Sequence, residues 1–233
     1  GRILILNDQS APESTGHGSP MPLLSHGGPG RAGGGEELGG LRGIKHYLQR
    51  TAIQGHPTML GQITEVYQVG GAQPEASIHP FRKYFEELVI GETLTTHKHT
   101  VTETDIVNFA NLTGDHFYAH VDETALEGTP FERRVAHGYW ILSKAAGMFV
   151  EPRKGPVMLN YGLEECRFTK PVYPGMTIGV RLTAKEKIAQ EQRDENDVPK
   201  GIVKWLVEVF DQNDETVAIA TILTLVRKKS STI

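Results

Sequence analysis

The sequence has a single cysteine, Cys166, among its 233 residues. One thiol cannot form a disulfide within the chain, so the sequence predicts a reducing compartment, with the cytoplasm as the expected location. No apolar run is long enough to cross a membrane, and the first residues lack the pattern of a signal peptide. Because the chain opens inside an apolar segment without a methionine, we expect it to be the C-terminal part of a longer polypeptide.

Basic residues are few and scattered. The 24 Lys and Arg are outnumbered by 28 Asp and Glu, which gives a formal net charge of -4 at pH 7. The longest basic run, residues 227–229, lies near the end of the chain. This balance argues against nucleic acid as the main partner, and no membrane partner is expected. Hydrophobic residues at 38% and charged residues at 22% are typical of a globular protein with a buried core.

Composition divides the chain into three zones. Residues 1–54 are rich in Gly, Pro and Ser and cannot bury enough apolar surface to fold alone; a short strand is expected near 3–6 and a short helix near 43–50. Residues 55–80 are punctuated by Gly and Pro and are expected to form a linker. Residues 81–229 form the predicted α+β domain.

Periodic patterns place helices and strands inside this third zone. Thr102 and Asp105 have the spacing of a capping box, which predicts a helix that ends at Gly114. A second helix is expected to begin near Gly138, and its wide apolar surface predicts that it is buried. Alternating apolar residues predict strands over 176–188, 203–209 and 217–225. An antiparallel sheet wrapped around one buried helix is a hot-dog fold, which we expect for this zone.

Two titratable side chains follow the first predicted helix. Asp115 lies on the exit loop that Gly114 permits, and His120 comes five positions later. A tight loop can turn a carboxylate and an imidazole toward one water, where they would serve as general base and acid of a hydration reaction. The alternative is that Asp115 is a turn residue and His120 a surface histidine.

The start of the buried helix is the second candidate element. Gly138 would present a backbone N–H at a helix N-terminus, where it can stabilise an oxygen on which negative charge develops. The alternative is a glycine that only allows tight packing. His137, one position earlier, is expected to orient the helix start rather than to transfer protons.

Together these stretches resemble the MaoC-like (R)-specific enoyl-CoA hydratases, over about residues 84–228. Three motifs of that family, Asp-x-Asn-Pro-x-His, Val-x-His-Gly and Phe-x-x-Pro-Val-x-x-Gly, correspond to residues 115–120, 135–138 and 168–175. The resemblance implies a hot-dog domain that adds water to an acyl-CoA thioester. It also implies that Asp115 and His120 are the catalytic pair, with Gly138 at the thioester oxygen.

One departure from the family's pattern bears on the substrate. The Asn-Pro inside the first motif is Phe117-Tyr118 here, and a serine of the family's central helix is Ala146. Aromatic and apolar surface would then face the substrate, which favours a bulky or cyclic acyl group over a straight chain. Phe117, Tyr118 and His137 are therefore candidate substrate-binding residues.

Residues 30–47 carry a separate resemblance, to the C-terminal segment of aldehyde dehydrogenases, which ends in an oligomerisation strand. A phosphate-binding loop is the rival interpretation, but Gly-Lys-Ser/Thr is absent. A dehydrogenase end followed by a MaoC-like domain resembles the bifunctional ring-opening proteins of phenylacetate degradation. That resemblance implies hydrolysis of oxepin-CoA by this chain. It also implies an NADP-dependent semialdehyde dehydrogenase as the rest of the protein, and no cofactor for the hydratase domain.

Several weaker candidates complete the set. Arg167 and Lys170 are expected either to meet the phosphates of coenzyme A or to be solvated surface residues. His97 and His99 would share a strand face, but no third ligand follows at suitable spacing, so no metal site is predicted.

Three classes of function remain open: a hydratase or ring-opening hydrolase, a hot-dog acyl-CoA thioesterase, and a non-catalytic assembly domain. Release of free thiol would identify a thioesterase, because a hydratase leaves the thioester bond intact. Hot-dog domains usually pair so that an exposed sheet edge is buried. A homodimer or a higher multiple such as a hexamer is therefore expected.

Overall fold

The computed structural model describes residues 2–5, 7–9, 52–194 and 196–229, and the chain divides into two compact units, Gly1–Ala72 and Gln73–Ile233. In the described part of the first unit, β1 (Arg2–Leu4) pairs in parallel with β2 (Ala52–Gln54), and α2 (Pro57–Thr64) follows. The strand expected near residue 3 is therefore present. The helix expected at 43–50 lies outside the described residues.

Helix α2 falls inside the stretch that the sequence predicts as a linker. Pro57 occupies the first helical turn, where a missing N–H costs nothing, and the His56 ring accepts a hydrogen bond from the Thr58 N–H at 3.3 Å. Glu65 closes the helix in the left-handed conformation, with φ of 56°. Proline acts here as a helix start, whereas the sequence interpretation took it as a break.

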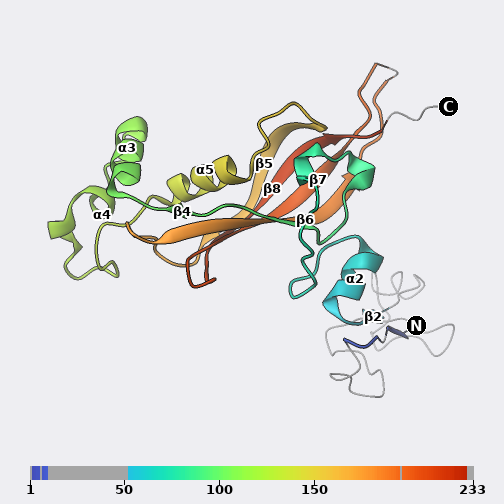
Figure 1. Ribbon diagram of the computed structural model, residues 1–233, viewed down its shortest axis with the longest axis horizontal. Coiled ribbons are helices and arrows are strands. Elements are labelled where there is room, and N and C mark those ends of the chain that lie inside the picture. The colour runs from blue at the N-terminus through green and yellow to red at the C-terminus, as the bar shows by residue number, and fades with distance from the viewer. Residues whose placement is uncertain (1, 6, 10–51, 195, 230–233) are drawn as a thin grey trace, which may run out of the picture. The chain divides into compact units, whose positions relative to one another are not determined.

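Six strands form the sheet of the second unit: β3 (Thr93–Thr95), β4 (His99–Thr100), β5 (Val157–Phe168), β6 (Thr177–Ala189), β7 (Lys200–Phe210) and β8 (Thr216–Arg227). All neighbours are antiparallel, in the order β3-β6-β7-β8-β5, and β4 also pairs with β6 (Figure 1). Strands β6, β7 and β8 correspond to the three predicted strands. Strand β5 forms one edge of this sheet.

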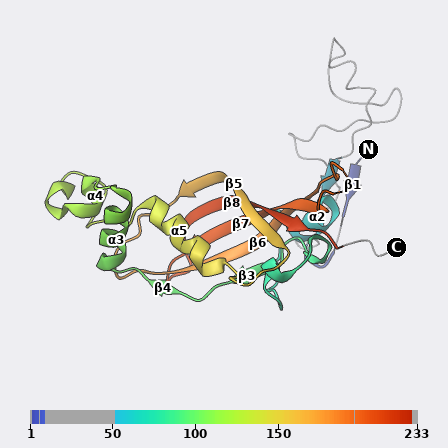
Figure 2. The same ribbon diagram turned by 90° about the horizontal axis from the view of Figure 1, so that it is seen from above.

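The helices of this unit are α3 (Glu103–Thr113), α4 (Tyr118–Val121) and α5 (Gly138–Phe149), with short 3-10 turns η3 (Pro80–Arg82), η4 (Phe85–Glu87) and η5 (Glu123–Leu126). Helix α5 runs across one face of the sheet (Figure 2). Its buried residues join one core with the inward side chains of the sheet, among them Ile141, Met148, Leu182, Trp205 and Val207. The predicted hot-dog fold is confirmed. Among the described residues, no helix is long and apolar enough to cross a membrane.

Helix α3 begins and ends where the sequence predicts. The Thr102 hydroxyl accepts a hydrogen bond from the Asp105 N–H at 3.2 Å, and the Asp105 carboxylate accepts one from the Thr102 N–H at 2.8 Å. Burial opposes ionisation of Asp105, but hydrogen bonds from Thr102 and His99 hold its pKa below the ordinary value. Gly114 ends the helix with φ of 77°, which places Asp115 on a sharp exit.

The alternation of apolar residues did not predict strand β5. Most of its side chains are exposed, so it lacks the alternation of a half-buried strand. Its pairing with β8 also shifts register three times, and Glu165 adopts φ of 49° next to one shift. Bulges of this kind insert an extra residue and bend the strand, so they interrupt its alternation.

Candidate functional site

Two short stretches meet beside the N-terminal end of α5. Helix α4 carries His120, and His137 directly precedes α5. The Val135 N–H donates to the Ala119 carbonyl at 3.0 Å, and the Ala136 N–H donates to the Val172 carbonyl at 2.8 Å. These bonds fix the segment before α5 between α4 and the loop after β5, so the two histidines are held side by side.

The rings of His120 and His137 are stacked, with centroids 3.7 Å apart and planes 26° apart. His120 Nδ1 lies 2.7 Å from the Val135 carbonyl oxygen, and His137 Nε2 lies 3.0 Å from the Asp115 carbonyl oxygen. A carbonyl only accepts hydrogen bonds, so both of these nitrogens must carry the proton. In its neutral form His120 therefore keeps Nε2 as an acceptor.

His137 is the most buried titratable side chain near α5, at 1% exposure. Its Nδ1 is buried without a hydrogen-bond partner among the described residues. Burial, aided by the nearby His120, lowers the pKa of His137 below 6.5, although its bond to the Asp115 carbonyl acts in the opposite direction. A second proton on this ring would create a buried N–H without an acceptor, so the neutral form is favoured.

The Asp115 side chain points to the same place. Its carboxylate accepts a hydrogen bond from the Phe117 N–H at 3.3 Å, which closes the loop after α3. One oxygen of Asp115 and one nitrogen each of His120 and His137 lie within 4.8 Å of one another. The carboxylate and the imidazole expected to form a pair are thus brought together.

The same three groups are of types that can ligate a metal ion. Nitrogen ligands coordinate one ion when their ring planes converge on it, whereas the His120 and His137 rings lie nearly parallel. One nitrogen of each ring donates to a backbone carbonyl, which leaves only His120 Nε2 and the buried His137 Nδ1 as ligand atoms, on rings that are stacked face to face. This arrangement suits proton transfer better than metal binding. Of the two histidines His97 and His99, His99 bonds Asp105 at 3.2 Å.

A cleft of about 470 Å³ opens beside His120. Four of the eight predicted site residues line this cleft and the other four do not. The cleft is lined by Phe117, His120, Gly138 and Lys170, whereas its lining does not include Asp115, Tyr118, His137 or Arg167. The other lining residues are mostly apolar and include Phe131, Ile141 and Phe168. The Lys170 ammonium forms an ion pair with Glu215.

Gly138 is required here by a close approach. A Cβ atom at this position would lie 2.5 Å to 2.9 Å from ring atoms of Phe168. Gly138 is the first residue of α5, and its N–H has no acceptor within the described part of the chain. The sequence interpretation proposed this N–H but missed Phe168, whose place over the helix start depends on contacts between distant segments.

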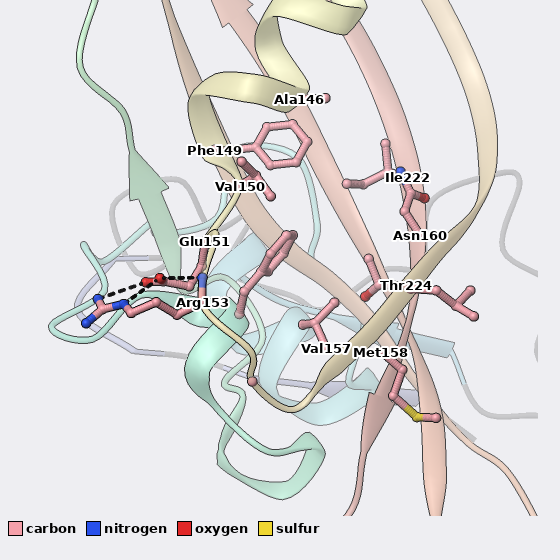
Figure 3. A pocket seen from close by; sticks show the side chains of 13 residues that line it. Ala146, Phe149, Val150, Glu151, Arg153, Val157, Met158, Asn160, Ile222 and Thr224 are labelled. Atoms are coloured by element: carbon pink, nitrogen blue, oxygen red, sulfur yellow. Dashed lines mark hydrogen bonds and ion pairs between the residues drawn. The ribbon is translucent and has the colours of Figure 1, made fainter.

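A second cavity, of about 270 Å³, lies at the other end of α5 (Figure 3). Its walls are mainly apolar, with Ala146, Phe149 and Ile222 among them. Its acidic group, Glu151, is bonded to Arg153 at 2.8 Å, and this partner lowers the pKa of Glu151 to about 2. A carboxylate held ionised by an arginine is a poor proton carrier, so the cleft beside His120 is the better candidate for chemistry.

The chain matches the family model described as MaoC like domain over residues 86–205. It is 60% identical over 193 residues to "Protein MaoC" of Klebsiella aerogenes, covering 83% of this chain and 58% of that protein. It is 31% identical over 112 residues to an "(R)-specific enoyl-CoA hydratase" of Rhodospirillum rubrum, covering 47% of this chain and 74% of that protein.

Among solved structures, a "Monoamine oxidase regulatory protein" from Archaeoglobus fulgidus is 33% identical, with a TM-score of 0.57. That alignment covers 68% of this chain and 99% of the other. The chain spans 58% of the length of its Klebsiella relative, so it corresponds to a part of that protein. The family model covers more than half of the 233 residues, and this chain belongs to the MaoC-like domain family.

Proposed function

We propose that this domain is an enoyl-CoA hydratase of the (R)-specific type, which adds water across the α,β double bond of an acyl-CoA thioester. The observation that carries the proposal is the convergence of Asp115 and His120 beside an apolar cleft whose wall includes Gly138. The named activity of the Rhodospirillum relative supports the same reaction. Because the reaction is reversible, dehydration of the 3-hydroxyacyl thioester is the same activity.

In the proposed reaction, Asp115 and His120 transfer protons and Gly138 stabilises the enolate. Asp115 and the free Nε2 of His120 hold a water, and one of them takes its proton as the oxygen attacks the β-carbon. The Gly138 N–H stabilises the enolate oxygen that forms on the thioester. The pair then returns one proton to the α-carbon, so the reaction consumes one water and no net proton.

His137 has a different role in this proposal from the substrate contact expected from the sequence. It is buried and absent from the cleft lining, but it contacts both members of the pair. We therefore assign it as a positioning residue, which fixes the Asp115 loop and the plane of the His120 ring.

We further propose that the acyl group of the substrate is cyclic. Three phenylalanines, Phe117, Phe131 and Phe168, line the cleft. Phe117 and Phe168 are 54% and 46% exposed, so they offer flat apolar surface to a ring. In oxepin-CoA the β-carbon also carries the ring oxygen. Water addition there gives a hemiketal, which collapses with cleavage of the ring C–O bond, and Asp115 or His120 supplies the proton to the leaving oxygen.

The test compares three readouts on the purified chain. We expect wild type to hydrate crotonyl-CoA or oxepin-CoA without release of free thiol. Thiol release at the rate of substrate loss would instead identify a thioesterase. No turnover of either thioester, in a folded protein, would favour the assembly domain. Faster turnover of oxepin-CoA than of crotonyl-CoA supports the cyclic substrate, and the reverse order rejects it.

We also propose that the protein pairs through β5. This edge strand exposes Met158, Leu159, Tyr161 and Leu163, at 39% to 52%. An apolar groove of about 500 Å³ lies between α5 and the inner side of the same strand. An unpaired apolar edge is an aggregation hazard unless a partner covers it, and a second copy covers both edges at once.

Sedimentation of two lysine variants tests this pairing. Leu163→Lys places a charge on the edge strand and is expected to give monomers. Val198→Lys is the matched control, because Val198 is 39% exposed in the loop between β6 and β7. The control is expected to sediment as wild type. A monomeric wild type, or a dimeric Leu163→Lys, contradicts the pairing.

Residues 1–54 are proposed to be the end of an NADP-dependent aldehyde dehydrogenase domain, whose remainder would be a partner of this chain. The support is the resemblance of residues 30–47, which lie outside the described residues. The linker proposed for residues 55–80 then joins the dehydrogenase end to the hydratase domain.

A further inference from the structure

The turn that follows β5 holds both ends of the segment that leads into α5, residues 131–137, which we call the entry segment. Near its end, the Ala136 N–H donates a hydrogen bond to the Val172 carbonyl at 2.8 Å. Near its start, the Glu132 N–H donates to the hydroxyl of Tyr173 at 3.3 Å. Val172 and Tyr173 are consecutive and both are buried, so two neighbouring residues of one turn fix the entry segment at both ends.

The ring of Tyr173 makes further contacts with the same segment. The guanidinium of Arg133 lies over this ring, 5.4 Å from its centroid, a distance typical of a cation–π interaction. The ring also belongs to a small buried apolar cluster against which Phe131 packs; its other members are Ala119, Leu126 and Val135. Three successive residues, 131 to 133, are thus tied to one side chain or to its apolar surroundings.

Tyr173 does not itself reach the cleft. The cleft lining includes its neighbour Val172 and also Phe131, but not Tyr173, which is only 9% exposed. A buried phenol usually needs a hydrogen-bond partner for its hydroxyl, and the Glu132 N–H supplies one. Any influence of Tyr173 on a bound acyl group is therefore exerted through the entry segment, at Phe131.

Of the three phenylalanines in the cleft, Phe131 has the least support from secondary structure. Phe168 is the last residue of β5, and Phe117 directly precedes α4. Phe131 lies between η5 and α5, where residues 127–137 form no helix or strand. Regular backbone hydrogen bonding therefore does not fix its place, and side-chain contacts must do so.

A second anchor of this loop is exposed to solvent. Arg134 pairs with Glu103 of α3 at 2.7 Å, and 54% of the Glu103 side chain is accessible. Solvent weakens such a pair, and exposed ion pairs contribute little to stability. Tyr173 is the buried anchor, so the position of Phe131 depends on Tyr173 more than on the ion pair.

We propose that Tyr173 is a positioning residue that sets the selectivity of the cleft for bulky acyl groups by holding Phe131 in the cleft wall. A bulky group on the β-carbon buries apolar surface against the phenylalanines, whereas a methyl group contacts little of them. Release of Phe131 therefore weakens the binding of a bulky acyl group more than that of a short one. The inference rests on the proposed function in one respect, that the acyl group of a thioester occupies this cleft.

Two saturated thioesters, acetyl-CoA and cyclohexylacetyl-CoA, test this by calorimetric titration of the full chain. Neither has an α,β double bond, so the ratio of their Kd values measures the acyl preference without any reaction. Wild type should bind cyclohexylacetyl-CoA more tightly. Tyr173→Leu should reduce this preference at least about fivefold, a loss of roughly 1 kcal/mol of binding, through weaker binding of cyclohexylacetyl-CoA alone. An equal loss for both thioesters, or an unchanged preference in the folded variant, overturns the inference.

A double-mutant cycle with Phe131→Ala identifies the route of the effect. Because Tyr173 acts through Phe131, Tyr173→Leu should change the preference by less than about twofold in the Phe131→Ala background, where the positioned group is gone. Losses that add independently would show that Tyr173 acts on the cleft in another way, or on the fold as a whole. Either result overturns the positioning role.

A conservative variant covers the case in which Tyr173→Leu fails to fold. Tyr173→Phe keeps the ring, its packing and its contact with Arg133, but it leaves the Glu132 N–H to solvent. The preference should fall at least about twofold, through the loss of one hydrogen bond. Arg134→Gln is the matched control, because it removes the exposed anchor of the same loop and should change the preference by less than about twofold. An unchanged preference in Tyr173→Phe, or a larger loss in Arg134→Gln, contradicts the inference.

Hydration of crotonyl-CoA by wild type keeps this inference distinct from the proposed function. A wild type that shows the Tyr173-dependent preference but hydrates nothing contradicts only the proposed function. A wild type that hydrates crotonyl-CoA but binds the two saturated thioesters equally well overturns only the inference about Tyr173. A wild type that binds neither thioester overturns it as well.

Discussion

The ring of His137 lies 3.7 Å from the ring of His120, while its Nε2 donates a hydrogen bond to the backbone carbonyl of Asp115 at 3.0 Å. One buried side chain thus contacts both members of the proposed catalytic pair. His137 was expected to orient the start of α5; the contacts show that it also holds the loop after α3. Because it does not line the cleft, its effect on catalysis is exerted through its neighbours.

Replacement of His137 should therefore lower kcat more than it changes KM. His137→Phe keeps a flat ring against His120 but removes the bond to Asp115, and a small displacement of a catalytic group costs about 10²-fold in rate. His137→Gln keeps a donor and removes the stack, so we expect a smaller loss. Unfolding experiments on both variants monitor stability, where one lost hydrogen bond costs about 1 kcal/mol. Unchanged kcat in a folded His137→Phe protein contradicts the positioning role.

The buried state of His137 also predicts a dependence of stability on pH. Burial lowers the pKa of His137 below its ordinary value of 6.5. As pH falls below 6.5, the unfolded chain takes up this proton before the folded chain does, so the free energy of unfolding decreases. The contribution is fully present above 6.5 and is lost as pH approaches the lower folded pKa.

Denaturant unfolding of wild type and His137→Phe over a pH series from about 5 to 8 measures this difference. Burial also lowers the pKa of His79, whose effect has the same sign and is common to both proteins. Wild type should therefore lose more stability toward acid pH than the variant does. Parallel curves for the two proteins rule out a depressed pKa of His137.

Two glycines of α5 give a matched pair of substitutions. Gly138→Ala places a methyl group 2.5 Å to 2.9 Å from the Phe168 ring, so the ring must move within the cleft. We expect hydration activity to fall, with a stability loss of about 1–3 kcal/mol from overpacking. Gly147→Ala meets nothing within 4 Å and should stabilise the helix by about 0.5–1 kcal/mol without loss of activity.

A double-mutant cycle tests the cause of the Gly138 effect. Phe168→Ala removes the ring that the new methyl group would meet, so Gly138→Ala should cost less stability in that background. A coupling above about 0.5 kcal/mol is expected for residues in contact. Independent effects of the two substitutions would show that the close approach of Gly138 to Phe168 is not what requires the glycine.

Much of the fold follows from short-range patterns. The capping box at Thr102 and the left-handed Gly114 are local devices, so the bounds of α3 could be predicted from the short stretch 102–114 alone. The same holds for β7 and β8, whose alternation is set by one buried face. Strand β5 could not be found in this way, because its exposure and bulges remove the alternation.

The candidate site was predictable in its chemistry but not in its contacts. The spacing of Asp115 and His120 indicated a loop that could bring them together, and both do lie within 4.8 Å of one another. The stacking of His137 on His120 joins residues on opposite sides of a loop, and no sequence periodicity encodes it. Phe168 reaches Gly138 from the end of β5, a strand that the patterns did not predict.

The capping box gives a stability prediction that is independent of the site. Thr102→Ala removes the hydroxyl that accepts from the Asp105 N–H, at a cost of about 1 kcal/mol. Thr102→Ser keeps the hydroxyl and should cost much less. Thermal unfolding of the two variants compares them directly. Equal stability of Thr102→Ala and wild type contradicts the importance of this cap for α3.

The central claim is that the Asp115 carboxylate takes part in water addition. Its most direct test is the hydration rate of Asp115→Asn beside that of Asp122→Asn, whose carboxylate only caps η5 through Thr124. Loss of an acid–base group typically lowers the rate by about 10²–10⁴-fold. We predict a loss of that size for Asp115→Asn, with folding and dimerisation intact, and wild-type turnover for Asp122→Asn. Equal turnover by Asp115→Asn and wild type would contradict the account.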